Sequence, residues 1–210
     1  MNLTTTAYGT WSGGRYMHFG ENLEEERLFK LILQSYESGV RTFVTSDVYG
    51  LGRADELIGE ALADFDRNTY CLVGMVGHDI YDGVRQGSKG YPRFTDPDLR
   101  GEDGYEEYVK RATTKSLERC KTDIFDLVML HNPDSAGYSS PVVWDAMESL
   151  KTAGLTDMIG LAPGPANGFI MDIIYCFENF GDRIDWSMLI LNPLEPWPQR
   201  HVLPVAEKHG

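Results

Sequence analysis

The sequence is short of positive charge, of cysteine and of long apolar runs. Lysine and arginine number 19 against 32 aspartates and glutamates, so the formal net charge is −13. A chain this acidic repels the phosphates of nucleic acids and of anionic membranes, and neither is an expected partner. No stretch approaches the roughly 20 apolar residues that a membrane-spanning helix needs. The composition therefore favours a soluble globular protein.

The three cysteines, Cys71, Cys120 and Cys176, are odd in number and lie far apart in the chain. Each is set within a segment that has helical or strand periodicity, which favours buried, reduced thiols over reactive ones. The first residues, MNLTTTAYGTW, have neither the basic nor the apolar region of a secretory signal peptide. We therefore expect a cytoplasmic protein.

What the sequence does contain is enough apolar residues for one core. Of its 210 residues, 42% are hydrophobic, and we expect them to form a single domain, residues 1–210. Segments typical of strands alternate with segments typical of helices. The expected strands are 4–8, 40–45, 70–76, 124–130, 158–161 and 184–191, the last with Trp186 in the core. The expected helices are one from Asn22 to Gly39, then 54–65, 105–120, 141–153, 168–180 and 202–208.

This alternation predicts an α/β fold with a parallel sheet, because each helix carries the chain back to start the next parallel strand. The strands and helices make six units. A closed (β/α)₈ barrel has eight units and typically about 250 residues. The chain is therefore expected to form either an open six-unit sheet or a barrel without its last quarter.

One stretch, Gly39–Gly50, organises the candidate site. Val40–Val44 is apolar and β-branched, as in a buried strand, and Thr45–Gly50 is polar and ends in glycine ahead of a helix. In α/β proteins, catalytic loops lie at the carboxyl ends of parallel strands. Tyr49 is therefore the first candidate catalytic residue.

Two long segments match a known pattern. The segment GVRTFVTSDVYGLGRADELIGEAL follows a strand that ends in Phe-Asp-Thr-Ala-x-x-Tyr-Gly, with Glu56 and Gly59 in the helix behind it. The segment KSLERCKTDIFDLVMLHNPD follows a helix–strand block that ends in His-x-Pro-Asp. Both resemble the aldo-keto reductase superfamily, and the similarity runs from about Thr6 to Gly210. The resemblance implies a TIM-type (β/α)₈ barrel of aldo-keto reductase type, with only about six βα units in this chain.

The resemblance carries over only two of the family's four catalytic residues. Tyr49 falls on the acid tyrosine and His131 on the histidine that orients the carbonyl. The aspartate falls on Val44 and the lysine on Met75. A tyrosine with its ordinary pKa near 10 exchanges protons poorly at neutral pH, and in the family the lysine lowers that pKa. The joint loss of both charges avoids leaving one of them buried alone.

The family also implies a nicotinamide cofactor, whose phosphate and adenosine groups would be bound largely beyond Gly210. The Ser-Asn pair that faces the nicotinamide falls on Ala162 and Pro163, and the glutamine falls on Met188. Asn192 matches the pattern and is the one cofactor-binding residue carried over. We therefore expect no cofactor, with NADPH the exception if the family's activity is retained.

These losses lead to a hypothesis of acid–base chemistry without hydride transfer. Tyr49 and His131 would then catalyse elimination or isomerisation of a small polar, carbohydrate-like or carbonyl substrate. One alternative is a conventional NAD(P)H-dependent carbonyl reductase with an unusual site, and another is an inert pair of residues in a barrel without activity. A third is a non-catalytic subunit, with the open barrel edge covered by a second copy or a partner chain.

Further polar and aromatic residues fall at expected strand ends or in the long loop 77–104. The expected substrate-binding residues are Trp11, Asp47, His78, Tyr81, Arg85 and Lys89. Arg93 is a third loop cation able to hold a carboxylate or phosphate, and Tyr16 another aromatic placed to line a pocket mouth. A metal site from Asp47, His78, Asp79, His131 and Asp134 is an alternative, but their spacing has no metal signature, and no metal is expected.

Overall fold

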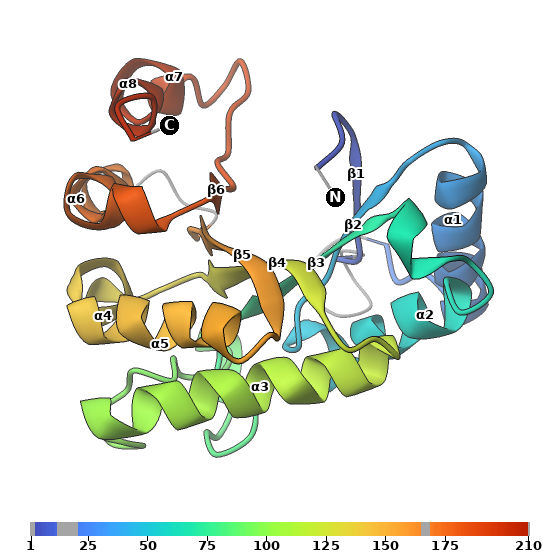
Figure 1. The fold of residues 1–210 in the computed structure, drawn as a ribbon, viewed down its shortest axis with the longest axis horizontal. Helices are drawn as coiled ribbons and strands as arrows, with labels where there is room; N and C mark the ends of the chain where they lie inside the picture. The colour runs from blue at the N-terminus through green and yellow to red at the C-terminus, as the bar shows by residue number, and fades with distance from the viewer. Residues whose placement is uncertain (1–2, 12–20, 165–168, 210) are drawn as a thin grey trace. The chain divides into compact units, whose positions relative to one another are not determined.

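The structure is a computed structural model that describes residues 3–11, 21–164 and 169–209. Its six-stranded sheet has the strands in sequence order, β1-β2-β3-β4-β5-β6. The strands are β1 (Ala7–Gly9), β2 (Thr42–Val44), β3 (Cys71–Val76), β4 (Phe125–His131), β5 (Thr156–Ala162) and β6 (Trp186–Ser187). The helices (Figure 1) include α1 (Glu25–Glu37), α2 (Arg53–Ala61), α3 (Tyr105–Cys120), α4 (Ser135–Ser139), α5 (Pro141–Thr152), α6 (Ile170–Phe180), α7 (Trp197–His201) and α8 (Leu203–Ala206).

The contacts divide the chain into two compact units. Unit 1 comprises Met1–Val76, Arg111–Val128 and Gly154–Asp157, and unit 2 comprises Gly77–Lys110, Met129–Ala153 and Met158–Gly210. The strand pairs β1–β2, β2–β3 and β5–β6 are parallel, as expected for strands joined through helices.

In unit 1, the register of β2 on β3 sorts the side chains onto two faces. Val44 pairs with Val73, so Val44 and Met75 lie on the same face of the sheet. Phe43 lies on the other face, where its ring is 6.3 Å from that of Tyr8 and 6.0 Å from that of Tyr70. The two positions on which the family's aspartate and lysine are expected to fall thus share one face and are both apolar.

A buried carboxylate joins four segments of unit 1. Asp55 of α2 is fully buried and accepts hydrogen bonds from the hydroxyls of Thr45 (2.7 Å) and Ser116 (2.8 Å). Thr10 donates to the Thr45 hydroxyl at 3.1 Å, and the Arg119 guanidinium lies 3.8 Å from Asp55. These bonds tie the end of β1, the loop after β2, and helices α2 and α3 together, so they fix the segment that leads to Tyr49.

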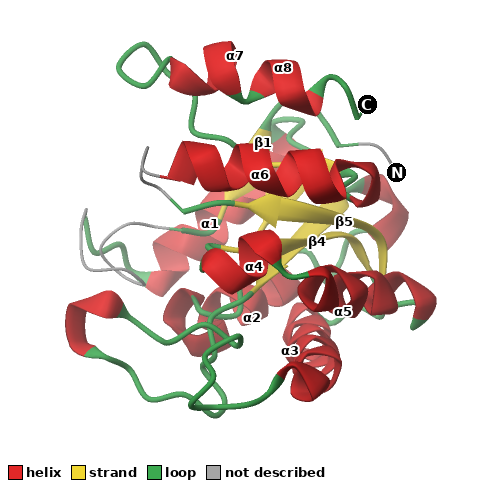
Figure 2. Cartoon of the chain, turned by 90° about the vertical axis from the view of Figure 1, so that its left-hand side faces the viewer, coloured by secondary structure: helices red, strands yellow, loops and turns green. Residues whose placement is uncertain are grey.

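Unit 2 contains the long loop between β3 and α3, drawn in green in Figure 2 with only short helical turns. Asp79 holds its first part, because one carboxylate oxygen accepts from the backbone N–H groups of Tyr81 (3.1 Å) and Asp82 (2.8 Å). Arg100 donates to the carboxylates of both Asp79 and Asp82. Further along the loop, the Phe94 ring stacks on Tyr108 of α3 at 5.3 Å. The loop for which the sequence predicts no regular structure is thus ordered by its own polar and aromatic side chains.

Elsewhere in unit 2, α6 packs against α4, as Figure 2 shows. Under these helices lies an apolar core that includes Tyr138, Trp144, Met147, Leu150, Ile173, Cys176 and Phe177. Cys71, Cys120 and Cys176 are all buried free thiols, as expected. Within the described ranges, no helix is long and apolar enough to cross a membrane.

The C-terminal segment differs from its prediction in two ways. β6 comprises only Trp186–Ser187, and Trp186 is 46% exposed, so its assignment to the core was wrong. The reason is that β6 stands last in the sheet order and pairs on one side only. The helix predicted over 202–208 is shorter, α8 (Leu203–Ala206), and a further short helix that was not predicted, α7, precedes it; Pro198 and Pro204 each occupy a first helical turn.

The first helix begins at Glu25, three residues after the predicted start signal at Asn22. Its N-cap residue is Glu24, whose side chain makes no capping hydrogen bond. The helix buries Leu28 and Ile32 on one apolar face. The helix boundary therefore follows the packing of this face more closely than the capping signal.

Candidate active site

Tyr49 begins a tight turn at the carboxyl end of β2. It is 7% exposed, and its backbone N–H donates to the carbonyl of Ser46 at 3.0 Å. The next three residues have positive φ: Gly50 at 60°, Leu51 at 55° and Gly52 at 93°. Glycine adopts this conformation at little cost, whereas Leu51 is strained in it. The turn allows the chain to pass from strand to helix while Tyr49 stays buried.

The surroundings of Tyr49 favour the neutral phenol. Burial first, and the charge of Asp47 second, raise the pKa of Tyr49 above its ordinary value. Val44 and Met75, on the neighbouring strands, bring no charge that would oppose this shift. Tyr49 therefore remains protonated across the physiological range.

Asp47, two residues before Tyr49, is fully buried. Its Oδ1 lies 3.4 Å from the Ser46 hydroxyl, which donates to it, while Oδ2 has no hydrogen-bond partner among the described residues. Burial first, and the charge of Asp55 second, raise the pKa of Asp47 well above its ordinary value. A carboxyl group so placed favours its protonated form and can act as a proton donor.

His131 is the last residue of β4 and is 5% exposed. Burial first, then the charges of His78 and Arg93, lower the pKa of His131 well below its ordinary value. The imidazole is therefore neutral at physiological pH and can accept a proton. Its ring centroid lies 5.1 Å from that of His78, which is also buried.

His78 follows β3 and bonds on both sides of its ring. Its Nδ1 lies 2.9 Å from Nη1 of Arg93, and its Nε2 lies 3.3 Å from the side-chain amide of Asn132. Burial first, then Arg93, lower the pKa of His78 to about 3. Tyr108 donates its hydroxyl to the His78 carbonyl at 2.8 Å, which fixes the backbone here. Two neutral imidazoles thus lie beside one guanidinium.

The structure groups some of the predicted site residues and separates others. Asp47 and Tyr49 lie close together in the sequence within unit 1, and His78 and His131 lie together in unit 2. Arg85 and Lys89 are exposed on the loop, and Trp11 is 41% exposed. Tyr81 is half-buried, with its ring 6.2 Å from that of Tyr108, and Tyr16 lies outside the described residues.

Asn132 is a site residue that the sequence patterns did not single out, although it directly follows His131. It is one of the non-glycine residues with positive φ, at 46°, and its N–H donates to the carbonyl of Ala162 at 2.7 Å. Asparagine is enriched in this left-handed region, so an asparagine between a strand-end histidine and Pro133 was a usable signal. Its side chain then reaches back to His78.

The positions assigned to the nicotinamide ring do not offer its usual partners. The side chains of Ala162, Pro163 and Met188 have no hydrogen-bond donor, and Met188 is 41% exposed. The Asn192 side chain accepts hydrogen bonds from the backbone N–H groups of Leu194 (2.9 Å) and Glu195 (3.1 Å), so its oxygen closes a local turn. These side chains therefore do not supply the hydrogen bonds that would hold the carboxamide group of a nicotinamide ring.

The carboxylates considered as metal ligands have other partners. Asp134 caps α4 through the N–H of Gly137 (2.9 Å) and accepts from the hydroxyl of Thr95 (2.6 Å). Asp79 is bound by Arg100 and by loop amides. In the part of the chain that the structure describes, no three histidine, cysteine, aspartate or glutamate side chains come together as metal ligands.

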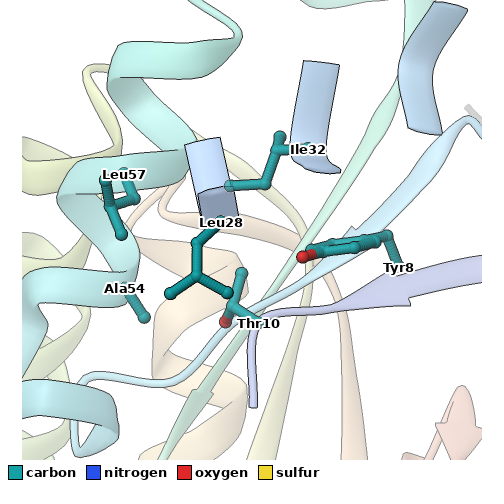
Figure 3. A pocket seen from close by; sticks show the side chains of 6 residues that line it. All are labelled: Tyr8, Thr10, Leu28, Ile32, Ala54 and Leu57. Atoms are coloured by element: carbon teal, nitrogen blue, oxygen red, sulfur yellow. The ribbon is translucent and has the colours of Figure 1, made fainter. Parts of the chain in front are cut away.

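A small pocket in unit 1 lies apart from these residues. Figure 3 shows it between β1 and the first two helices, lined by Tyr8, Thr10, Leu28, Ile32, Ala54 and Leu57. It has room for about one water molecule, which is too little for a substrate.

Comparison with known proteins identifies the pattern. A profile described as "Aldo/keto reductase family" matches residues 6–210. The chain is 29% identical over 186 residues to YqkF, an uncharacterized oxidoreductase of Bacillus subtilis, covering 89% of this chain and 54% of that protein. It thus spans about half the length of this relative.

Solved structures show the same fold. The aldo-keto reductase AKR11C1 from Bacillus halodurans, in its holo form, is similar with a TM-score of 0.74 and 22% identity, over 100% of this chain and 60% of that one. An aldo-keto reductase from Klebsiella pneumoniae in complex with NADPH has a TM-score of 0.62 and 19% identity, over 95% of this chain and 61% of that one. The fold is therefore that of a (β/α)₈ barrel of this type, of which the chain supplies six βα units.

Proposed function

We propose a function from the premise that this chain belongs to the aldo/keto reductase family. Its relatives include oxidoreductases, so its ancestry lies in carbonyl chemistry. The proposal is that the chain retains acid–base chemistry on a small polar, carbohydrate-like or carbonyl substrate without transferring hydride. Tyr49 and His131, the two family positions that it keeps, supply the reacting groups.

One observation carries the proposal: burial and Asp47 raise the pKa of Tyr49, and no ammonium stands at Met75 to lower it. A reductase needs the phenol to give up its proton as hydride reaches the carbonyl carbon. A phenol with a raised pKa holds its proton and instead serves as a neutral hydrogen-bond donor. That role suits an enolising carbonyl, whose oxygen gains only partial charge.

His131 is the proposed general base, and its imidazole favours the neutral form. Its lowered pKa keeps the imidazole neutral at physiological pH, which is the form that can accept a proton. Such a base removes a proton from the carbon next to a carbonyl and returns it to the same or the neighbouring carbon. Exchange, isomerisation and elimination all begin with this step.

The proposal is tested by deuterium wash-in, which detects proton removal whatever the final product is. The protein is incubated in D₂O with a panel of aldoses, ketoses and hydroxy ketones and no nicotinamide, and exchange next to the carbonyl is followed by proton NMR. We expect enzyme-dependent exchange on at least one compound. His131→Gln should lower its rate about 10²–10⁴-fold, and Tyr49→Phe should lower it by a smaller factor.

Exchange that persists in both variants would remove Tyr49 and His131 from the chemistry. A control is Asp123→Asn, an exposed carboxylate in unit 1 that contacts none of the site residues named above. Its exchange rate should equal that of the unaltered protein.

The comparisons favour a second candidate, an NADPH-dependent carbonyl reductase, because a solved structure of this fold holds NADPH. NADPH added to the protein would then show a blue-shifted or quenched fluorescence that saturates, and would be consumed on adding aldehydes. The first candidate expects neither response.

A further inference from the structure

Arg93 is a partly buried arginine that forms hydrogen bonds only to uncharged groups among the described residues. Arg53, Arg67, Arg100 and Arg183 each form ion pairs with aspartate or glutamate. Arg93, in the loop before α3, is also partly buried, but it forms no ion pair with any described residue. The charge of Asp134 favours the Arg93 guanidinium without an ion pair between them. In a chain with a formal charge of −13, a guanidinium beside the candidate base that no carboxylate contacts needs an explanation.

Neutral groups hold two of the three guanidinium nitrogens. Nε donates to the backbone carbonyl of Asn132, and Nη1 donates to the carbonyl of Tyr91 at 3.2 Å and to Nδ1 of His78 at 2.9 Å. Nη2 has no hydrogen-bond partner among the described residues and is not enclosed. The guanidinium is therefore fixed in orientation with its two remaining N–H groups open.

The tautomer of His78 follows from this arrangement. Arginine only donates, so Nδ1 of His78 accepts, and the ring carries its proton on Nε2. The structure places the Asn132 amide nitrogen 3.3 Å from Nε2, and rotating the amide by 180° brings its oxygen to that proton instead. Arg93 then offers the N–H groups of Nη2 next to the neutral ring of His78.

The cluster stands directly beside the candidate base. Asn132 follows His131 in the chain, and the rings of His78 and His131 are 5.1 Å apart. An anionic group on Arg93 would be positioned by a rigid anchor, with the rest of a small molecule within reach of His131. Arg85 and Lys89, the exposed cations of the same loop, have no such fixed position.

We propose that Arg93, oriented by Asn132 and His78, binds a carboxylate of the substrate, so that the substrates are small carbonyl or hydroxy acids. The inference rests on the proposed function only in taking His131 as the reacting group. A carboxylate fits better than a phosphate, because its single negative charge matches the single charge of one guanidinium, whereas a dianion would require further cations. Arg93 is here a substrate-binding residue.

The test uses the full chain, acetate as the probe and acetamide as its uncharged counterpart. Histidine is labelled with ¹³C at Cε1, and the signals of His78 and His131 are assigned from spectra of His78→Gln and His131→Gln. At constant ionic strength, acetate should shift both signals saturably in the millimolar range, and acetamide should not. The signals of His201, the last residue of α7, and of His209, which follows α8, should stay in place.

Arg93→Gln should weaken acetate binding about tenfold or more, since a hydrogen bond to a charged group is lost. Arg200→Gln, an exposed arginine of unit 2, is the matched control and should bind acetate normally. If Arg93→Gln does not fold, as judged by its melting curve, the comparison of acetate with acetamide in the unaltered protein decides.

The proposal is overturned if acetate produces no saturable shift, or if acetamide produces the same one. It is also overturned if folded Arg93→Gln binds acetate as well as the unaltered protein does. Tighter binding of inorganic phosphate than of acetate would reject the carboxylate as the ligand class. None of these outcomes depends on turnover, so a failed deuterium wash-in and a failed acetate titration remain separate results.

Discussion

At the scale of single residues, buried titratable groups dominate the chemistry of this chain. Asp47, Asp55, His78 and His131 are all buried, and each has a pKa shifted toward its neutral form, with burial as the largest cause. Buried groups that favour their neutral forms suit proton transfer, because no charge must be desolvated before the substrate binds. The same shifts make stability depend on pH.

Asp55 gives the clearest residue-scale prediction. Burial raises its pKa to about 6, although the hydroxyls of Thr45 and Ser116 oppose the shift. The folded state therefore binds the proton more tightly than the unfolded state does. The resulting stabilisation is complete below about pH 4 and is lost as the pH rises through about 6, a change of about 2–3 kcal/mol.

Asp55→Asn stays neutral at every pH and should lack this slope. In urea unfolding at pH 4 and pH 7, the stability of the unaltered protein relative to the variant should fall at the higher pH. His78, whose pKa is lowered to about 3, stabilises the fold at neutral pH and loses that effect in acid, but it is common to both proteins and cancels. If the free energy of unfolding changes with pH in the same way in both proteins, Asp55 is not the group responsible. Asp123→Asn is the control and should keep the pH dependence of the unaltered protein.

At the scale of elements, close packing holds unit 1 together where α2 meets the end of α3. A Cβ on Gly59 would lie 2.5 Å from the carbonyl oxygen of Arg119 and 2.8 Å from the carbonyl carbon of Cys120. Both are backbone atoms, which cannot rotate away as a side chain can. Close packing against the backbone of α3 therefore explains why a glycine stands at position 59 of this helix.

Gly59→Ala sets two effects against each other. Alanine is the better helix former by about 1 kcal/mol, whereas the backbone clash costs about 1–3 kcal/mol or more. We expect the clash to prevail and the variant to lose stability in urea unfolding. Gly9→Ala, where a Cβ meets nothing within 4 Å, is the control and should change stability little. A more stable Gly59→Ala would show that the helices separate at low cost.

At the scale of the whole molecule, the segment from β6 to α7 exposes an unusual amount of apolar surface. The exposed side chains are Trp186 (46%), Met188 (41%), Ile190 (39%), Leu191 (48%), Leu194 (90%) and Trp197 (46%). Several large, exposed apolar side chains close together along the chain are typical of a surface that a binding partner covers. The partner expected from the sequence, a second copy or another chain at the sheet edge, remains our proposal for this surface.

A second copy would make the molecular mass depend on concentration. We expect light scattering to report a weight-average mass above that of one chain, and Leu194→Glu to lower it toward 23.6 kDa. Val84→Glu, at a side chain 80% exposed on the loop before α3, is the control and should leave the mass unchanged. A single-chain mass at all concentrations would reject self-association and leave a different partner chain to be sought.

Much of the fold could be predicted from the order of residues, because apolar periodicity is a local property. The prediction of α3 over 105–120 matched the structure, and β3 and β4 matched within one residue at each end. The predictions were poorest for β6 and the last helices, where two prolines and an unpaired strand edge decide the outcome. There, neighbours in space outweigh propensity.

For the candidate site, the sequence by itself determined the resemblance to the family, and it predicted that Tyr49 and His131 are retained and that Val44 and Met75 replace charged residues. These are identities at motif positions, and no folding is needed to read them. Only the tertiary structure decided that Arg93, rather than Arg85 or Lys89, is fixed beside the histidines. Its partners Asn132 and His78 lie 39 and 15 residues away, and no sequence pattern encodes such contacts, because they exist only after the loop packs onto the end of β4.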